Sequence, residues 1–173
     1  MLNELESMKN NQVWELVEPH KSQKLVGSKW VFKTKKDKDG RIERFKARLV
    51  AKGFTQREGI DYTETFSPVS TKDSFRIIMA LVAHYDLLLH QMDVKTAFLN
   101  GELEEENYTR QPEGFAKEGR EHMVCKLGKA IYGLKQASRR WYFKFHQTVS
   151  SYGFEENIAD QCIYLKKCGS RFI

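Results

Sequence analysis

The sequence predicts an α+β fold with a mixed or antiparallel sheet and packed helices. Apolar residues recur every three or four positions in three segments, the period of an amphipathic helix, and alternate with polar residues in several shorter segments, the period of a half-buried strand. Helices and strands interleave without a regular βαβ repeat, which argues against a parallel, doubly wound sheet. The 173 residues correspond to about one domain.

The N-terminal third is expected to form a short helix, a strand and a long β-hairpin. Apolar residues at every third position predict the helix over residues 2–8, and residues 13–17 predict a strand that ends before Pro19. Two strand-like segments, residues 26–34 and 41–52, flank a polar turn that ends in glycine. These two segments are therefore expected to pair as a two-stranded hairpin.

The second arm of this hairpin has a cationic and an apolar side, because side chains alternate along a strand. The cationic side carries Ile42, Arg44, Lys46, Arg48 and Val50, and the apolar side carries Glu43, Phe45, Ala47, Leu49 and Ala51. Three cations at successive alternate positions can grip phosphate groups, since Arg and Lys donate to phosphate oxygens. The alternative is the solvated side of an ordinary half-buried strand.

The rest of the chain is expected to alternate between helices and short strands. We expect irregular chain over residues 53–72, a core-facing helix over 71–86 and a buried strand over 87–92, with Asp93 at its C-terminal end. The remaining expected elements are strands over 106–111, 122–127 and 161–166, a helix over 137–152, a turn at 168–170 and a last strand from residue 171.

The positive charge is concentrated in blocks. The chain carries 29 Lys and Arg against 23 Asp and Glu, a net charge of +6. Residues 21–57 hold thirteen basic and three acidic residues, residues 122–150 hold six basic and no acidic ones, and residues 101–121 are net acidic. Such blocks indicate that particular surfaces meet a polyanion, unless they are only solvated basic faces.

The composition excludes several classes of protein. With 40% hydrophobic residues, three Pro and eleven Gly, the chain is not disordered, collagenous or of low complexity. No apolar run reaches the ~18 residues of a membrane span, and the N-terminus lacks a signal-peptide layout. We therefore expect a soluble, intracellular protein without a membrane partner. Its three cysteines, without metal-ligand spacing, are expected to be buried, reduced thiols.

Asp93 has the context that suits catalysis best. A carboxylate at the end of a core strand is held rigidly and suits a ligand for Mg²⁺ that bridges to phosphates. The alternative is a helix cap or a turn carboxylate, because two-metal phosphoryl transfer needs carboxylates from more than one segment and no second ligand is evident. The sequence contains no glycine-rich phosphate loop, no metal-ligand pairing of histidines and no nucleophile elbow.

Six ordered runs of residues carry a resemblance to a known family. They are Lys29 to Lys33 (KWVFK), Lys46 to Phe54 (KARLVAKGF), Gly59 to Tyr62 with Glu64 to Val69 (GIDY, ETFSPV), Gln91 to Gly101 (QMDVKTAFLNG), Gln111 to Phe115 (QPEGF), and Ile131 to Ala137 before Arg140-Trp141-Tyr142 (IYGLKQA, RWY). In this order they resemble the reverse transcriptase of Ty1/copia-type long-terminal-repeat retrotransposons, particularly the plant elements. The resemblance spans nearly the whole chain.

The resemblance implies the fingers and part of the palm of a right-hand polymerase fold. It further implies RNA-directed DNA polymerase activity with two Mg²⁺ ions. Asp93 corresponds to the first catalytic aspartate, which binds both ions, and the carbonyl of Val94 would add a ligand. Phe98 corresponds to the steric gate that disfavours a sugar 2′-hydroxyl. Its alternative is an ordinary core aromatic.

The resemblance also implies contacts to substrate. The triphosphate would be gripped by Lys35, Lys36, Lys46 and Arg48, and Gln136 would lie beside the nucleotide and the template base. Contacts to the nucleic-acid backbone would come from Lys52, Arg139, Arg140 and Lys144, although a helix that turns its aromatic residues inward exposes such cations in any case. The implied partners are an RNA or DNA template-primer, deoxynucleoside triphosphates and the remainder of the Pol polyprotein.

The resemblance makes residues 1–173 the N-terminal part of the domain. In the family, the strand that begins at Arg171 leads into a Tyr-Val-Asp-Asp hairpin with the other catalytic aspartates, which this chain lacks together with the thumb and ribonuclease H. Residues 107–109 also depart from the usual Ile-Tyr-Met. We therefore expect the chain to be inactive alone. Its expected location is a cytoplasmic virus-like particle or the nucleus. The alternatives are a non-catalytic nucleic-acid-binding remnant of a degenerate retroelement, and a chain that folds unstably because its sheet edge is open.

Overall fold

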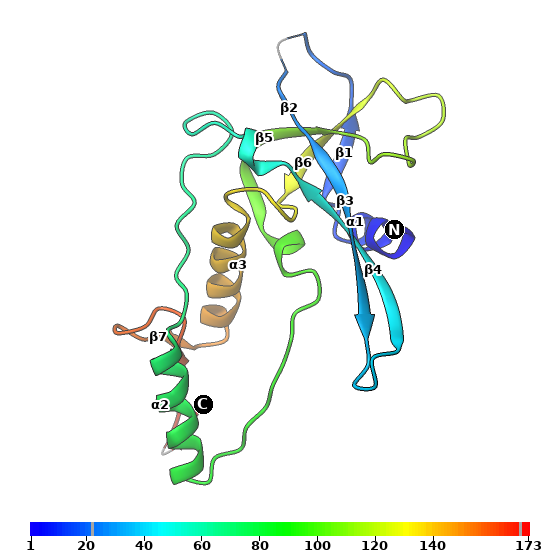
Figure 1. The fold of residues 1–173 in the computed structure, drawn as a ribbon. Coiled ribbons are helices and arrows are strands. Elements are labelled where there is room, and N and C mark those ends of the chain that lie inside the picture. Colours follow the sequence, from blue (N-terminus) through cyan, green and yellow to red (C-terminus); the bar gives the residue numbers. More distant parts are fainter. Residues whose placement is uncertain (22, 170) are drawn as a thin grey trace. The chain divides into compact units, whose positions relative to one another are not determined.

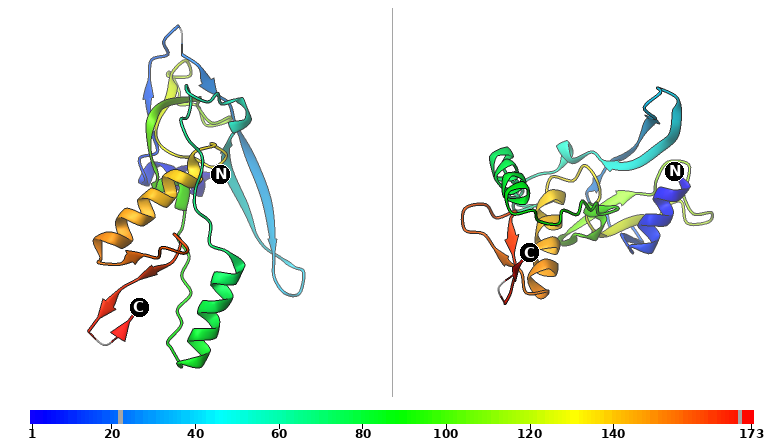
Figure 2. Two further views of the ribbon diagram at one scale, coloured as in Figure 1. Left: turned by 90° about the vertical axis from the view of Figure 1, so that its left-hand side faces the viewer. Right: turned by 90° about the horizontal axis from the view of Figure 1, so that it is seen from below.

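The computed structural model describes residues 1–21, 23–169 and 171–173. These residues form two compact units (Figures 1 and 2), of which the first comprises residues 1–66 and 96–141, and the second residues 67–95 and 142–173. Ser170, in the expected turn at 168–170, lies outside the described residues. No helix of the described part is long and apolar enough to cross a membrane.

A four-stranded mixed sheet organises the first unit. Its strands lie in the order β1 (Trp14–Val17), β6 (Val124–Lys129), β5 (Glu102–Arg110) and β2 (Leu25–Val26). The first three are antiparallel neighbours, whereas β2 runs parallel to β5. This sheet and helix α1 (Leu2–Asn10) confirm the α+β class, the mixed sheet and the expected N-terminal helix and strand.

The long hairpin is present as β3 (Ser28–Lys36) and β4 (Ile42–Ala51), which extend beyond the mixed sheet (Figure 1). Gly40 closes its turn at φ +81°, a conformation that side-chain-bearing residues rarely adopt. The apolar side of β4 is buried only at its base, where Leu49 is 1% exposed, whereas Phe45 near the tip is 78% exposed. The expected apolar face is therefore packed over only part of its length.

The core of the first unit joins residues that are far apart in the sequence. Val13 and Ile131 are fully buried, and so is Leu99 from the 3₁₀ helix η2 (Ala97–Asn100). A second 3₁₀ helix, η1 (Gly53–Thr55), follows β4. The other buried members of this core are Met8, Val26, Leu49, Ala51, Leu127, Ala130, Leu134 and Ala137. Removal of these side chains from water is the main stabilising contribution to this unit.

The second unit contains α2 (Lys72–His84) and most of α3 (Ala137–Ser151). Two short hairpins complete it, β7 (Glu155–Glu156) with β8 (Tyr164–Leu165) and β9 (Lys167–Cys168) with β10 (Arg171–Phe172). Both helices lie where the sequence predicts them. The expectation that α2 faces a core is wrong for the described structure, in which none of its residues is buried.

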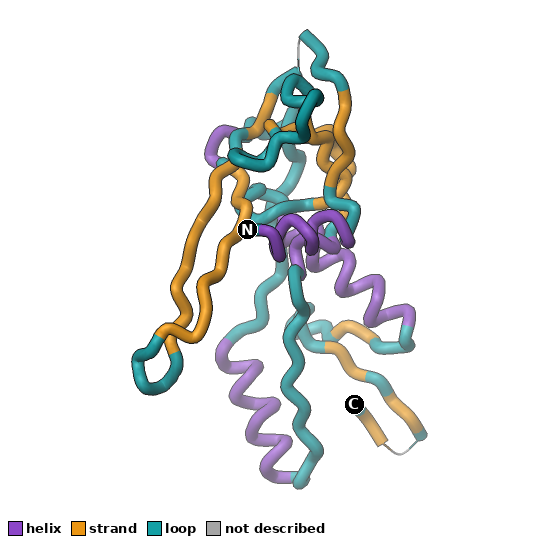
Figure 3. The backbone as a smooth tube through the Cα atoms, turned by 90° about the vertical axis from the view of Figure 1, so that its right-hand side faces the viewer, coloured by secondary structure: helices purple, strands orange, loops and turns teal. Residues whose placement is uncertain are grey.

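The buried strand expected over residues 87–92 is also wrong. These residues form an irregular segment after α2 (Figure 3), and Leu88 is 92% exposed. A strand needs a neighbour that takes up its backbone hydrogen bonds, and no described strand pairs with this segment. Because a short apolar run does not specify its structure by periodicity alone, the assignment failed here. Asp93 consequently lies in exposed, irregular chain.

Candidate functional site

One side of the β3–β4 hairpin is lined by cations from both strands. Residues directly opposite each other in an antiparallel pair share a face of the sheet. The register pairs Lys29 with Val50, Val31 with Arg48, Lys33 with Lys46, and Lys35 with Arg44. The cationic face of the hairpin therefore consists of Lys29, Lys33, Lys35, Arg44, Lys46 and Arg48.

The cationic face places like charges side by side. Lys33 and Lys46 are direct cross-strand neighbours, and so are Lys35 and Arg44. Because like charges in this arrangement destabilise a hairpin, an anion that neutralises them binds favourably. Lys36 lies beyond an irregularity in the register and is exposed.

Arg48 lies against the aromatic ring of Tyr132. Its guanidinium carbon is 5.2 Å from the centroid of that ring, a cation–π distance. The Arg48 Nε atom is buried and has no hydrogen-bond partner among the described residues. A carboxyl group from α1, that of Glu4, is buried near this cation. Burial raises the pKa of Glu4, although the positive charges of Arg48 and Lys46 act to lower it.

Phe98 packs against the same tyrosine. The ring centroids of Phe98 and Tyr132 are 5.4 Å apart, and their planes are inclined by 55°. Phe98 belongs to η2, where its neighbour Leu99 is fully buried, and both aromatic rings pack against the core of the first unit. Arg48 and Phe98, which the sequence assigns to two separate motifs, thus share Tyr132 as a neighbour.

The backbone of Tyr132 is fixed to the end of β4. Its carbonyl oxygen accepts a hydrogen bond from the amide of Ala51 over 2.7 Å. Gly133 follows at φ +89°, and a Cβ atom at this position would collide with the carbonyl oxygen of Ala51. A Cβ atom on Gly53 would likewise collide with the carbonyl oxygen of Gly133. Both glycines are therefore required for this close approach of two backbone segments.

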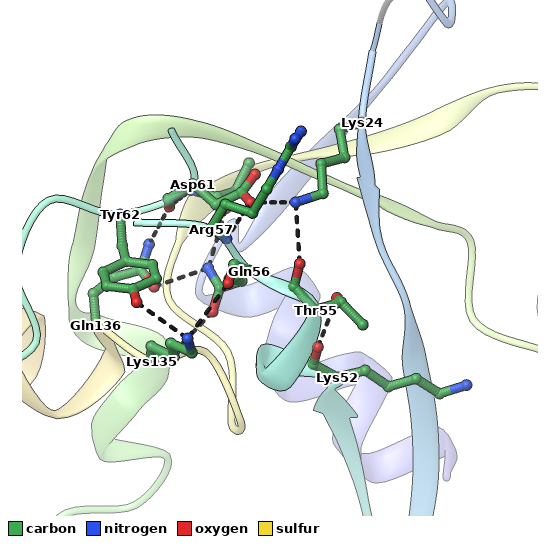
Figure 4. A network of polar contacts seen from close by, with 10 residues as sticks. Lys24, Lys52, Thr55, Gln56, Arg57, Asp61, Tyr62, Lys135 and Gln136 are labelled. Carbon is green, nitrogen blue, oxygen red and sulfur yellow. Dashed lines mark hydrogen bonds and ion pairs between the residues drawn. The ribbon is translucent and has the colours of Figure 1, made fainter. Parts of the chain in front are cut away.

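A buried network of side-chain amides holds Lys135 and Gln136, which follow Gly133 in the sequence (Figure 4). Gln56 Nε2 donates to Gln136 Oε1 over 3.1 Å and to Asn107 Oδ1 over 3.4 Å. Gln56 Oε1 accepts a hydrogen bond from the backbone amide of Lys135 over 2.9 Å. Asn107 and Gln136 both donate to the carbonyl oxygen of Asp61, over 3.1 and 2.9 Å. These bonds satisfy polar groups that would otherwise be costly to bury.

Gln136 lies fully inside this network. Its amide nitrogen donates to Asp61 and its amide oxygen accepts from Gln56, so both ends of the side chain are engaged within the protein. A direct contact between this side chain and a nucleotide stays a prediction. In the described structure, Gln136 connects the segment after Tyr132 to residues 56–61.

Two lysines extend the network to charged partners. Lys24 Nζ lies 2.6 Å from Asp61 Oδ2. Burial acts to raise the pKa of the Asp61 carboxyl, but the hydrogen bonds from Lys24 and the backbone amide of Arg57 outweigh it and lower the pKa. Lys135 Nζ donates to the hydroxyl of Tyr62 over 3.1 Å (Figure 4). Residues 56–62 are therefore held by Lys24 at Asp61 and by Lys135 at Tyr62.

The two arginines at the start of α3 are engaged by carboxylates. Arg140 lies 2.5 Å from Glu104 and 3.2 Å from Glu105. Arg139 lies 2.8 Å from Glu64. Contacts of these guanidinium groups to a nucleic-acid backbone stay predictions, and they would require these ion pairs to open.

The other expected site residues are divided between the units. Asp93 and Val94 lie in the irregular segment of the second unit. Lys144 lies exposed on the part of α3 that belongs to the second unit, and Lys52 is half-buried in the first unit. Among the described residues, no group of three or more His, Cys, Asp and Glu side chains is placed to hold a metal ion. A two-metal site needs carboxylates from more than one segment, so the described residues do not form a complete one.

Comparison with known proteins decides the family. Residues 11–173 match the family described as reverse transcriptase (RNA-dependent DNA polymerase). The chain belongs to the reverse transcriptase family. All the expected site residues of this reverse transcriptase chain, including the cationic face, lie within the matched range.

This reverse transcriptase chain is similar to plant transposon polyproteins, as its motifs predict. It is 52% identical over 167 residues to the Retrovirus-related Pol polyprotein from transposon TNT 1-94 of Nicotiana tabacum, which covers 96% of the chain and 13% of that protein. It is 41% identical over 174 residues to the Retrovirus-related Pol polyprotein from transposon RE1 of Arabidopsis thaliana, which covers 100% of the chain and 12% of that protein.

A yeast relative is more distant. The chain is 28% identical over 148 residues to the Truncated transposon Ty1-A Gag-Pol polyprotein of Saccharomyces cerevisiae, which covers 82% of the chain and 11% of that protein. The reverse transcriptase chain thus spans about an eighth of the length of these three curated relatives. No solved structure matches it.

Sequence reasoning assigned no role to Tyr132, Gln56 or Asn107 in this reverse transcriptase. A signal for Asn107 was present, because Asn107 and Thr109 alternate on β5 and both point inward. Polar residues at successive inward positions of a strand indicate a buried polar network. Tyr132 offered no such signal, since its partners come from β4 and η2 and become neighbours only in the folded unit.

Proposed function

We propose that this chain forms the fingers and part of the palm of a reverse transcriptase, and that its cationic face holds the triphosphate of an incoming deoxynucleotide. A longer polyprotein would use this site for RNA-directed DNA synthesis on a template-primer. Family membership supports the reaction, and the register of the hairpin supports the binding site.

The cationic face is the observation that carries the proposal. A triphosphate concentrates several negative charges, and Arg and Lys side chains hold such groups by charge-assisted hydrogen bonds. Of the acidic residues of the hairpin, Asp37 and Asp39 lie in the turn and Glu43 lies at the irregularity of the register, so none belongs to a cross-strand pair of this face. The cross-strand pairs of the face therefore present cations to an anion and include no carboxylate.

Phe98 is proposed to lie beside the sugar of the nucleotide. Its ring is held against Tyr132 and against the core of the first unit. A bulky, fixed ring disfavours a larger sugar by steric exclusion, so a 2′-hydroxyl would be selected against.

Asp93 and the carbonyl of Val94 are proposed as the ligands that this segment contributes to Mg²⁺. Carboxylate and carbonyl oxygens are the ligands that this hard cation prefers. Further ligands for a second ion are not gathered among the described residues.

Binding of nucleic acid without catalysis is a second candidate function. The cationic face favours it, because the phosphates of any polynucleotide can neutralise the same cations. Since Arg139 and Arg140 are engaged by carboxylates, we assign such binding to the cationic face of the hairpin.

The two candidates are separated by titrating the 173-residue chain with dGTP and with a single-stranded oligonucleotide, followed by calorimetry. We expect the double variant Lys46→Ala/Arg48→Ala to bind dGTP at least about tenfold more weakly, because hydrogen bonds to charged groups are worth about 1.5–3 kcal/mol each. The matched control Lys9→Ala/Lys117→Ala removes the same charge from exposed positions outside the hairpin, and should leave the affinity within about twofold.

The result for dGTP decides whether the nucleotide site exists. Equal dGTP affinities of the hairpin variant and the unaltered chain would overturn it. A hairpin variant that loses only oligonucleotide binding, with a steep dependence on salt concentration, would favour the second candidate.

A further inference from the structure

The ring of Tyr132 is shared by the two residues that the proposed function assigns to different parts of a nucleotide. The Arg48 guanidinium carbon is 5.2 Å from its centroid, and the Phe98 centroid is 5.4 Å from it. We propose that Tyr132 is a positioning residue that couples the phosphate-binding Arg48 to the sugar-facing Phe98. This inference rests on the proposed function and names a residue outside the cationic face.

The anchoring of Tyr132 suits this role. Its neighbour Ile131 is fully buried, Leu134 is buried as well, and its own carbonyl accepts the hydrogen bond from Ala51. The backbone at Gly133 lies so close to β4 that a Cβ atom there would collide with the carbonyl oxygen of Ala51. The backbone of Tyr132 is therefore held against the strand that carries Arg48, and its ring neighbours both Arg48 and Phe98.

For Arg48, a neighbouring ring on an anchored backbone lowers the free-energy cost of binding an anion. An arginine side chain has many rotamers, and its ordering on binding costs free energy. A ring below the guanidinium group restricts these rotamers before an anion arrives and leaves the planar donor groups able to bond to oxygen. The buried Nε atom has no hydrogen-bond partner among the described residues, so the contact with the Tyr132 ring is not replaced by a hydrogen bond at that atom.

The coupling has a specific consequence for sugar selection. Because Arg48 and Phe98 share one ring, an anion bound at Arg48 also restricts the ring against which Phe98 packs. Discrimination between dGTP and GTP should therefore depend on Arg48, which does not touch the sugar in the proposed site. Two independent contacts would show no such dependence.

The first experiment titrates the 173-residue chain with inorganic tripolyphosphate, dGTP and GTP. We expect Tyr132→Leu to weaken tripolyphosphate binding about fivefold and to reduce the preference for dGTP over GTP. Arg48→Ala should reduce the same preference, whereas Tyr132→Phe, which retains the ring, should retain both properties. Thermal melting of each variant identifies the temperature range in which it is folded.

A second experiment changes the electron density of the ring with only a small change in its size. Phenylalanine and 3,4,5-trifluorophenylalanine are placed at position 132, because fluorine withdraws the electron density that attracts a cation. We expect the fluorinated chain to bind tripolyphosphate about threefold more weakly than the phenylalanine chain at equal melting temperature. A purely structural ring would bind equally in both forms.

The outcomes separate this inference from the proposed function. If Arg48→Ala weakens tripolyphosphate binding but the fluorinated and phenylalanine chains bind alike, the positioning role of Tyr132 is wrong and the nucleotide site remains. If Arg48→Ala leaves tripolyphosphate binding unchanged, the inference is wrong. If Lys46→Ala/Arg48→Ala also leaves this binding unchanged, the proposed function fails as well.

Discussion

Arg140 and Glu105 form an ion pair of 3.2 Å in which both side chains are largely withdrawn from solvent, with exposed fractions of 10% and 11%. Glu104 approaches the same guanidinium group from solvent, and the hydrogen bond from Arg140 lowers its pKa. Desolvation of two ions is costly and is offset only while both partners are present. Arg140 therefore holds the first turn of α3 to β5, in addition to carrying a positive charge.

Replacement of Arg140 by methionine should destabilise the protein. Arg140→Met leaves Glu105 buried without its partner, so we expect the free energy of unfolding to fall by about 3 kcal/mol. Urea denaturation followed by circular dichroism measures the change.

Arg139→Met is the matched control, because it removes the same charge from the adjacent position. Its partner Glu64 is 54% exposed, so the loss should be below about 1 kcal/mol. Adding Glu105→Gln to Arg140→Met should recover part of the stability. Equal losses for the two arginine variants would show that burial of the Arg140 pair does not matter.

Asn107→Leu should destabilise the protein by about 2 kcal/mol, because it removes the acceptor of one Gln56 hydrogen bond and a donor to the Asp61 carbonyl. Thr109→Val is the control on the same strand, since the Thr109 hydroxyl donates to a carbonyl over 3.3 Å and should cost about 1 kcal/mol or less. Denaturation of both variants measures the difference. A Thr109 variant as unstable as the Asn107 variant would argue against a special contribution from the amide network.

The pairings within the amide network could not be predicted from the sequence because the paired residues meet only through the topology. Gln56 is 51 residues from Asn107 and 80 from Gln136. No local pattern specifies such pairings. The hairpin, in contrast, follows from local alternation and a glycine turn, and both arms were placed correctly to within a few residues.

The cationic face was predictable only in part from the alternation of side chains along a strand. The alternation of β4 alone predicts that Arg44, Lys46 and Arg48 share a side. The lysines of β3 join them only because the register pairs the two strands as it does. Register depends on the turn and on packing at the base of the hairpin, which the sequence pattern does not contain.

Asp160 should make the stability of the second unit depend on pH in acid. Hydrogen bonds from the Ser74 side chain and the Cys162 amide, with further ones from Ser70 and Thr71, lower the pKa of Asp160 to about 2. Because the pKa of Asp160 is lower in the folded than in the unfolded chain, its ionised carboxylate stabilises the folded state at pH values above the usual pKa of 3.8. This stabilisation is lost as the pH falls through about 2. Asp160→Asn should therefore lower the melting temperature at pH 6 and have less effect at pH 2.

The control for this pH dependence is Asp73→Asn. The Asp73 side chain is 83% exposed in its pair with Arg76, so its replacement should change the melting temperature little at either pH. A difference between the unaltered chain and Asp160→Asn that stays constant from pH 6 to pH 2 would contradict the assigned hydrogen bonds.

The three cysteines should react with a thiol reagent at different rates. All are free thiols, as expected, but the expectation that all are buried is wrong, because Cys168 is exposed and Cys162 is half-buried. Burial raises the pKa of Cys125 to about 12, and the thiolate is the reactive form. At pH 8, Cys168 should react first and Cys125 only after unfolding in urea. Rapid reaction of the Cys168→Ser variant at a second site would contradict this order.

Gly133 and Gly114 provide a matched pair that tests the anchoring of Tyr132. Both have positive φ, +89° and +80°, so alanine at either position should cost about 1–2 kcal/mol of backbone strain. A Cβ atom on Gly114 meets open space, whereas one on Gly133 collides with the backbone of Ala51. Gly133→Ala should therefore lose about 1–3 kcal/mol more than Gly114→Ala in urea denaturation.

The same pair connects stability to ligand binding. If the collision displaces the Tyr132 ring from Arg48, Gly133→Ala should also weaken tripolyphosphate binding at a temperature where the variant is still folded, and Gly114→Ala should not. Equal stability losses would show that the two backbone segments separate at little cost. The fixed position of Tyr132 would then need another cause, and the coupling between Arg48 and Phe98 would lose its structural basis.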